Sequence, residues 1–256
     1  MNSLTKKNII ITMLVLLSVT LVFSSCMLPS NGEPSIPGNG EGNGSLEPDE
    51  IKFQDAKLEQ AVRVKINKPS GKLYQDDVIG ITKLEAEKRG ITSIEGIQYL
   101  KNLQDLDLDD NKIVDISPLS GLAKLKELDL ENNQITDLSP LSGLINLEEL
   151  DFEKNKVSDI SPLSNLTKLK ELEFEHNQVS DISALANLTR LRELDFSNNN
   201  VTDLSPLVSN TGIGSGDEID MRYNYLDLTA GSKNMQDITT LINRGVQVKY
   251  SPQRKP

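Results

Sequence analysis

The sequence is poor in the residue types that most often carry catalytic or metal chemistry. Among its 256 residues there is no tryptophan, one histidine and one cysteine, and aromatic residues make up 4% of the chain. A single cysteine excludes a disulfide within one chain, and one histidine and one cysteine leave a Cys/His metal site short of ligands. Basic residues are also outnumbered: 27 Lys and Arg against 38 Asp and Glu give a formal charge of −11. This acidity argues against nucleic acid or a bare anionic lipid surface as partners and favours cationic ones.

The amino terminus has the features of a targeting segment. Lys6 and Lys7 precede an apolar run of 15 residues, Ile9 to Phe23, which suits a signal-peptide core and is short for a membrane span. Small residues then lead to Cys26, and this arrangement resembles a bacterial lipoprotein signal. The resemblance implies that residues 1–25 are removed and that Cys26 carries lipid. The alternative is an ordinary secretory signal with an incidental cysteine.

Residues 26–50 consist of this cysteine and a segment rich in Gly, Pro, Ser, Asn and Glu, which predicts a disordered linker. Residues 51–80 contain Phe53, Leu58, Ala61, Val62, Val64 and Ile66, spaced as on one face of a short helix with Asp55 near its start. We interpret residues 51–80 as an amino-terminal helical cap.

A period of 22 residues dominates the rest of the chain. It is marked by asparagines, each preceded by apolar residues eight, five and three positions earlier: Asn111, Asn133, Asn155, Asn177 and Asn199. Including divergent first and last copies, residues 81–224 form seven repeats. The alternating segment before each asparagine predicts a short strand with one face in the core, and the asparagine amides are expected to form a ladder between neighbouring repeats.

The second half of each repeat is too short for a long helix. Ser117 before Pro118 suits a helix N-cap and first position, so one helical turn or a 3-10 segment is expected there. Residues 225–256 leave the repeat pattern. Met235, Ile238, Leu241 and Ile242 fit one helix face, Gly245 fits its stop, and Val246, Val248 and Tyr250 alternate as in a closing strand. These residues predict a carboxy-terminal cap.

The motif Leu125-x-x-Leu128-x-Leu130-x-x-Asn133-x-Ile135-x-Asp137-Leu138-x-Pro140-Leu141-x-x-Leu144 and its copies resemble the 22-residue leucine-rich repeats of the internalins and related bacterial surface proteins. The resemblance implies an α/β solenoid, a leucine-rich-repeat horseshoe. Its concave face would be a parallel β-sheet, its convex segments short 3-10 turns, and both ends capped. The sequence lacks the LPxTG sorting signal, Ig-like domain and basic cell-wall modules of typical internalins, so binding of an invasion receptor is not carried over.

Alternation places three side chains of each repeat on the concave face, and 18 of the 21 are carboxylates. The candidate partner-binding residues are Asp105, Asp107, Asp109, Glu127, Asp129, Glu131, Glu149, Asp151, Glu153, Glu171, Glu173, Glu175, Glu193 and Asp195. Parallel strands lie about 4.8 Å apart, so repulsion between these groups is expected to raise the central pKa values. Basic residues at one rim are expected to offset part of it: Lys124, Lys126, Lys168, Lys170, Arg190 and Arg192.

Three interpretations of this acidic face remain open: a solvated face that opposes aggregation, a docking surface for a cationic protein, peptide or polyamine, or a weak site for a divalent cation such as calcium. Calcium prefers six to eight oxygens from a flexible loop, which strands supply poorly, so neither a metal site nor a cofactor is expected beyond weak calcium binding. The acids recur with the repeat and are expected to be exposed, and no catalytic residue is predicted. His176 fills a variable turn position and is expected at the surface.

The sequence thus predicts a monomeric, non-enzymatic recognition protein. It would be extracytoplasmic, held at a bacterial cell surface by lipid on Cys26, and would bind a basic protein or peptide but no nucleic acid. The alternative is a structural or divalent-cation-binding envelope lipoprotein without a specific protein ligand.

Overall fold

The computed structural model describes residues 49–255. The expected signal peptide, Cys26 and nearly all of the expected linker therefore lie outside the described residues. Among residues 49–255, no helix combines the length and the apolar content needed to cross a membrane.

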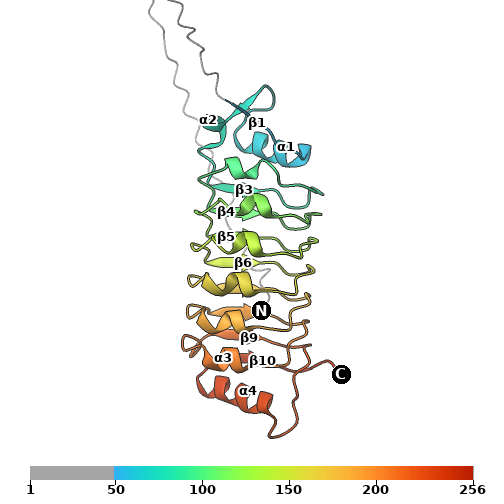
Figure 1. Ribbon diagram of the computed structural model, residues 1–256, viewed down its shortest axis with the longest axis vertical. Coiled ribbons are helices and arrows are strands. Elements are labelled where there is room, and N and C mark those ends of the chain that lie inside the picture. The colour runs from blue at the N-terminus through green and yellow to red at the C-terminus, as the bar shows by residue number, and fades with distance from the viewer. Residues whose placement is uncertain (1–48, 256) are drawn as a thin grey trace, which may run out of the picture. The chain divides into compact units, whose positions relative to one another are not determined.

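The described residues form a leucine-rich-repeat solenoid whose coils stack in chain order (Figure 1). One parallel sheet of eight strands runs through the stack in the order β10-β9-β8-β7-β6-β5-β4-β3. The strands are β3 (Lys83–Glu85), β4 (Asp105–Asp107), β5 (Glu127–Asp129), β6 (Glu149–Asp151), β7 (Glu171–Glu173), β8 (Glu193–Asp195), β9 (Glu218–Asp220) and β10 (Gln247–Lys249). The fold class expected from the 22-residue period is confirmed.

Short helical segments form the opposite side of the coils. They are η2 (Ile97–Tyr99), η3 (Ser117–Leu119), η4 (Ser139–Leu141), η5 (Ser161–Asn165), η6 (Ser183–Asn187) and the single α-helical turn α3 (Ser205–Ser209). The prediction that Ser117 caps its segment was wrong, because Ser117 is the first helical residue. The capping oxygen belongs to Asp115, whose Oδ1 accepts the Ser117 N–H at 2.8 Å. Asp137, Asp159, Asp181 and Asp203 do the same in the following repeats.

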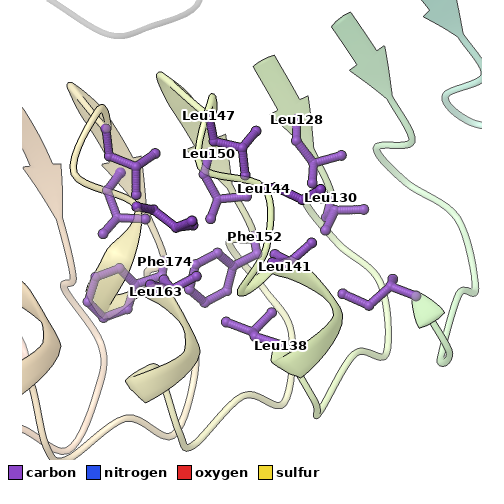
Figure 2. Close-up of a cluster of buried hydrophobic side chains, with 14 of the residues drawn as sticks. Leu128, Leu130, Leu138, Leu141, Leu144, Leu147, Leu150, Phe152, Leu163 and Phe174 are labelled. Atoms are coloured by element: carbon purple, nitrogen blue, oxygen red, sulfur yellow. The ribbon is translucent and has the colours of Figure 1, made fainter. Parts of the chain in front are cut away.

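The core is a continuous stack of buried aliphatic side chains that also contains Phe152, Phe174 and Phe196. Figure 2 shows Phe152 and Phe174 among the leucines of neighbouring coils. Phe152 and Phe174 stack with ring centroids 5.5 Å apart, and Phe174 and Phe196 follow at 5.9 Å. All three side chains are fully buried. The phenylalanines occupy the inward position that leucine fills in earlier repeats, which makes them core residues rather than ligand contacts.

The asparagines tie each coil to the one before it. Nδ2 of Asn133 donates to the carbonyl oxygen of Leu108, 25 residues earlier, at 3.0 Å, and Oδ1 accepts the N–H of Ile113 at 3.0 Å. Asn111, Asn155, Asn177 and Asn199 repeat this pattern, and Asn224 adds a further rung at the last repeat. The residue before each asparagine has a positive φ, from 51° at Asn132 to 57° at Tyr223. The chain therefore turns sharply there and delivers the amide into the coil.

Caps close both ends of the stack. The amino-terminal cap consists of α1 (Ala56–Lys65), α2 (Gln75–Val78) and the antiparallel strands β1 (Glu50–Ile51) and β2 (Leu73–Tyr74). The pairing of these two strands was not predicted from the sequence. Strand β1 begins one residue inside the segment expected to be a linker. Asp55 caps α1, since its Oδ1 accepts the Lys57 N–H at 2.9 Å. At the other end, α4 (Lys233–Asn243) packs on β10.

Two residues assigned to the apolar faces of the cap helices are not buried. Val64 of α1 is 69% exposed and Ile242 of α4 is 46% exposed. The buried apolar residues of the two helices are others: Leu58, Ala61 and Val62 in α1, and Ile238 and Leu241 in α4. The prediction that they face the core was therefore wrong.

Candidate interaction surface

The fourteen candidate carboxylates lie together along the parallel sheet. We call them the acidic strip: Asp105, Asp107, Asp109, Glu127, Asp129, Glu131, Glu149, Asp151, Glu153, Glu171, Glu173, Glu175, Glu193 and Asp195. The first two acids of each repeat are the outer residues of a three-residue strand, and the third follows just after the strand ends. The strands pair in register, so each carboxylate has an equivalent carboxylate as its neighbour, as for Asp129 beside Asp151.

The strip is less exposed than the sequence analysis expected. Asp109 is only 6% exposed, and most acids of the middle and third positions are half-buried, while Glu127, Glu149 and Glu193 at the first position are exposed. The close approach of neighbouring coils and the backbone hydrogen bonds of the aspartates hold the middle row near the sheet. Oδ1 of Asp151, for example, accepts the N–H of Glu153 at 2.9 Å.

Several strip carboxyls hold their protons more tightly than usual. Burial, with further contributions from Asp129 and Glu173, raises the pKa of Asp151 to about 9. Burial and the neighbouring carboxylates also raise the pKa of Glu173 to about 7 and that of Glu175 to about 10. The pKa values of Glu127 and Asp195 are raised for the same first reason, burial. The direction matches the sequence analysis, but desolvation rather than repulsion is the larger cause.

Four of the predicted rim residues make their direct contacts outside the strip. Of those predicted, Lys124 and Lys168 bond to the side-chain oxygens of Asn102 and Asn146, Lys170 pairs with Glu148, and Arg192 lies 3.6 Å from Asp217. The direct contacts of these four groups are therefore with residues outside the strip. These side chains leave the strand on the rim and contact the polar residues of the adjacent coil there.

Lys83, Lys88 and Lys154 contact the strip instead. Lys83 pairs with Asp105 at 2.6 Å, and Lys88 pairs with Asp109 at 2.9 Å. Lys154 pairs with Glu131 at 3.0 Å and with Glu153 at 2.8 Å. Lys88 and Lys154 stand at the positive-φ position before the asparagine, a row of side chains that the sequence analysis treated only as variable. His176 occupies the same row and is exposed, as expected.

These ion pairs are unevenly distributed along the strip. The amino-terminal end has Lys83 and Lys88, and beyond the carboxy-terminal end Arg222 pairs with Asp220 at 2.6 Å. Between Lys154 and Arg222, the strip is formed by β7, β8 and the residues that directly follow these strands. There, carboxylate oxygens of Glu171, Glu173 and Glu193 lie within 4.8 Å of one another. Three such oxygens are fewer than the six to eight that calcium prefers.

Comparison with known proteins identifies the family. Models of paired leucine-rich repeats match residues 123–165, 145–187 and 167–209, and a further leucine-rich-repeat model matches residues 93–135. The solved structure of internalin C2 from Listeria monocytogenes is 34% identical; the match covers 78% of this chain and 94% of that one, with a TM-score of 0.60. The chain belongs to the internalin-like leucine-rich-repeat family. Internalin-like repeat arrays are protein-interaction modules, and the matches indicate no catalytic family.

Other members of the family extend beyond the region of similarity. The solved internalin inlF of L. monocytogenes is 34% identical, with a TM-score of 0.72, and the match covers 83% of this chain and 61% of that one. Internalin H of the same species is 43% identical over 63 residues, which are 24% of this chain and 12% of that protein. A leucine-rich-repeat protein of Leptospira interrogans shares the fold at 19% identity, with a TM-score of 0.56. The internalin-like chain thus spans about three fifths of inlF and a small part of internalin H.

Proposed function

We propose that this internalin-like protein is a non-enzymatic recognition module that binds a basic protein or peptide through the acidic strip. The observation that carries the proposal is the density of carboxylates on one face of a rigid sheet. Neighbouring strands align like charges, which is unfavourable unless a proton or an external cation compensates them. A lysine or arginine side chain lying across β6, β7 and β8 would meet carboxylates from each strand.

The raised pKa values add to this proposal. Near neutral pH, groups such as Glu175 and Asp151 retain protons in the free protein. An approaching ammonium or guanidinium group would lower those pKa values and take the place of the protons. Binding of a basic partner would then release protons, and opposite charge would steer its approach.

Two measurements test this function: the effect of salt on binding, and the effect of removing the positive charges of the peptide. The affinity of a lysine-rich peptide is measured at about 0.05 M and about 0.3 M salt, conditions that change the screening length by more than twofold. We expect the higher salt to weaken binding several-fold. A peptide of equal length with alanine in place of lysine should not bind. Equal affinity for both peptides, or no effect of salt, would refute an electrostatic docking surface.

The proposed location is extracytoplasmic, at the bacterial cell surface, through lipid on Cys26. Support comes from the apolar run before that cysteine and from the family, which includes internalins of L. monocytogenes. Expression in a bacterium fed a fatty-acid analogue would label the protein, and Cys26→Ser would abolish labelling. Labelling that persists in the variant would rule out a lipoprotein anchor.

A second function, binding of divalent cations without a protein ligand, is favoured only by the convergence of Glu171, Glu173 and Glu193. Calcium would then raise the melting temperature, and Glu173→Gln would remove that effect. A protein that responds to calcium but not to basic peptides would be a cation-binding envelope protein rather than a recognition module.

A further inference from the structure

The two edge strands of the parallel sheet differ in what lies beside them. At the amino-terminal edge, helix α1 packs against β3. At the other edge, within residues 49–255, β10 pairs with β9 alone. An open strand edge presents unpaired N–H and C=O groups, to which another extended chain can add as a further strand. β10 is therefore the place where this sheet can be extended.

The backbone of β10 has one side available for such pairing. Toward β9, Gln247 donates its N–H to the carbonyl oxygen of Asp217 at 2.8 Å, and Lys249 accepts the N–H of Met221 at 2.8 Å. Successive residues of a strand direct their backbone groups to opposite sides. The N–H and C=O of Val248, which lies between these two residues, therefore point away from β9.

The residues that follow β10 continue along the coil rather than across this open side. The carbonyl oxygen of Pro252 accepts the N–H of Tyr223 at 2.7 Å. Arg254 in turn donates its N–H to the carbonyl oxygen of Asn224 at 2.7 Å. These bonds attach the segment to the turn that follows β9, so it occupies the same layer as β10 and leaves the outer side of that strand uncovered.

The side chain of Val248 shows that the last layer of the core is also incompletely covered. It lies at the middle of β10 and is only half-buried. The middle residue of each strand from β3 to β9 is at most 2% exposed. Tyr250, two residues further on, is likewise only partly buried against the core. An apolar side chain of an added strand would cover this layer, as each coil covers the one before it.

The charge on β10 indicates which kind of strand fits. Lys249 aligns with Asp220 of β9, whose carboxylate Arg222 already binds, with Nε to Oδ1 at 2.9 Å and Nη2 to Oδ2 at 2.6 Å. In the described part of the chain, Lys249 itself forms no ion pair. Opposite charges on neighbouring strands stabilise a sheet, and like charges destabilise it. A carboxylate is therefore favoured on the far side of Lys249.

We propose that the open edge of β10 binds an extended acidic segment of a partner protein as an added strand. A carboxylate of the segment would lie beside Lys249 and an apolar side chain beside Val248, whose backbone would exchange hydrogen bonds with it. A second copy of this chain fits less well, because residues 221–256 carry six basic side chains and two acidic ones, and two such ends repel. This site goes beyond the function proposed for the acidic strip and does not depend on it.

The probe is a six-residue peptide of alternating valine and glutamate. It is titrated to roughly 5 mM, which suits a dissociation constant near 1 mM, against the isotope-labelled full chain while backbone amide signals are followed by NMR. We expect saturable shifts at Val248 and Tyr250, and slower hydrogen exchange of the Val248 N–H. A peptide with lysine in place of glutamate can bind the acidic strip but should not produce these changes, so the two sites are tested separately.

Methylation of the peptide nitrogens tests whether binding is strand addition. A strand pairs through one of its two sides, so methylation of the valine nitrogens and of the glutamate nitrogens, in separate peptides, should have different effects. One form should bind at least about tenfold more weakly, since it loses two hydrogen bonds of roughly 1 kcal/mol each, and the other should bind like the parent peptide. Equal binding by the two methylated forms would overturn the proposal.

Variants of β10 test the two residues named. Val248→Pro removes the outward N–H but no bond to β9, and proline is accommodated at strand edges. It should bind the glutamate peptide at least about fivefold more weakly than Val248→Ala, which keeps the N–H and is the matched control.

Lys249→Gln should weaken binding about two- to fivefold, the effect of one exposed ion pair, whereas Lys65→Gln, the same charge change in α1 at the other end of the sheet, should not. Far-ultraviolet circular dichroism checks that each variant is folded. The proposal fails if the glutamate peptide shifts neither Val248 nor Tyr250, or if Val248→Pro and Val248→Ala bind it equally.

Discussion

Asp151 on β6 and Glu173 on β7 are direct partners in the parallel sheet, so two half-buried carboxyl groups stand side by side one strand apart. Burial is the larger cause that raises the pKa of Asp151 to about 9 and that of Glu173 to about 7; the charges of Asp129 and Glu173 add to the first, and those of Glu171 and Glu193 to the second. The strip is therefore a surface whose charge depends on pH, and this links the stability of the solenoid to the binding that we propose.

The stability of the protein should decrease as the pH rises from about 5 to about 8. A carboxyl group whose pKa is raised by folding binds more protons in the folded protein than in the unfolded chain. It therefore lowers the free energy of unfolding as the pH rises from the pKa of the unfolded chain, about 4, to the pKa of the folded protein. For Glu173 that window ends near 7 and for Asp151 near 9. We expect the free energy of unfolding in urea to fall by roughly 1–3 kcal/mol over this range.

Asp151→Asn should reduce that dependence and raise stability at pH 8, since the amide can still accept the Glu153 N–H without carrying a charge. Asp76→Asn, at an exposed position in the cap, is the control and should have little effect. Stability that increases with pH between 5 and 8 in the parent protein would contradict the raised pKa values.

Affinity for a basic peptide should increase with pH over the same range. Deprotonation of Glu173, and then of Asp151, adds negative charge to the strip just where the basic ligand would lie. We expect the dissociation constant to be several-fold smaller at pH 8.5 than at pH 6. It is measured by calorimetry in two buffers of different ionisation enthalpy. The difference between buffers should also reveal proton release on binding. Affinity independent of pH, with no protons released, would separate the carboxyls from the binding event.

Removal of a repeat cap should destabilise the solenoid modestly. Asp137 accepts the Ser139 N–H at 2.8 Å and its hydroxyl at 2.8 Å, which begins η4. Asp137→Ala should lower the free energy of unfolding by about 1 kcal/mol, as for other lost caps. Thr136→Ala, the exposed neighbour, should change it little. Equal effects of the two substitutions in urea unfolding would show that the cap contributes nothing.

Removal of one asparagine from the ladder should lower the free energy of unfolding more than the loss of the Asp137 cap does. Nδ2 of Asn155 donates to Leu130, Phe152 and Glu153, and Oδ1 accepts the Ile135 N–H. Asn155→Ala leaves buried backbone groups without partners, which costs roughly 2–4 kcal/mol when their desolvation is counted. The exposed Gln134→Ala serves as the control. A loss below about 0.5 kcal/mol in chemical unfolding would mean that water replaces the amide and that the ladder is not a main support.

The sequence predicts the fold well because the period couples every repeat to the same geometry. Leu128 and Leu150 recur at 22 residues and pair directly in the sheet, so one correctly assigned strand places the others. The pairing of β1 with β2 could not be predicted, since two-residue strands leave no alternation to detect and α1 separates them in the sequence. The asparagine ladder was visible in the sequence, and so was the aspartate two residues before each Ser-Pro, but its capping role was assigned to the wrong oxygen.

The placement of the acidic strip on the sheet was predicted from the sequence, but the burial of its side chains was not. Alternation correctly brings the carboxylates to one face, yet exposure depends on how closely successive coils pack, which the pattern does not encode. The same limit explains why the pairing of Lys83, Lys88 and Lys154 with the strip was not predicted. Lys154 reaches Glu131 because residue 154 has a φ of 53°, and sequence alone does not reveal where that turn directs its side chain.

The central claim is that the middle of the acidic strip is the binding surface for a basic partner. The direct test is the dissociation constant of a lysine-rich peptide at about pH 9, where Glu173 is ionised and Asp151 partly so. It compares a strip variant with a control variant that has the same number of carboxyl-to-amide substitutions and loses at least as much charge. The strip variant carries Asp151→Asn, Glu173→Gln and Asp195→Asn, and the control carries Asp49→Asn, Asp76→Asn and Glu95→Gln away from the strip. We predict at least about tenfold weaker binding by the strip variant, since three lost charge pairs of about 0.5–1 kcal/mol each add to that amount, and less than about twofold change in the control. Equal affinity of the two variants would show that only net charge matters and that the strip is a solvated face.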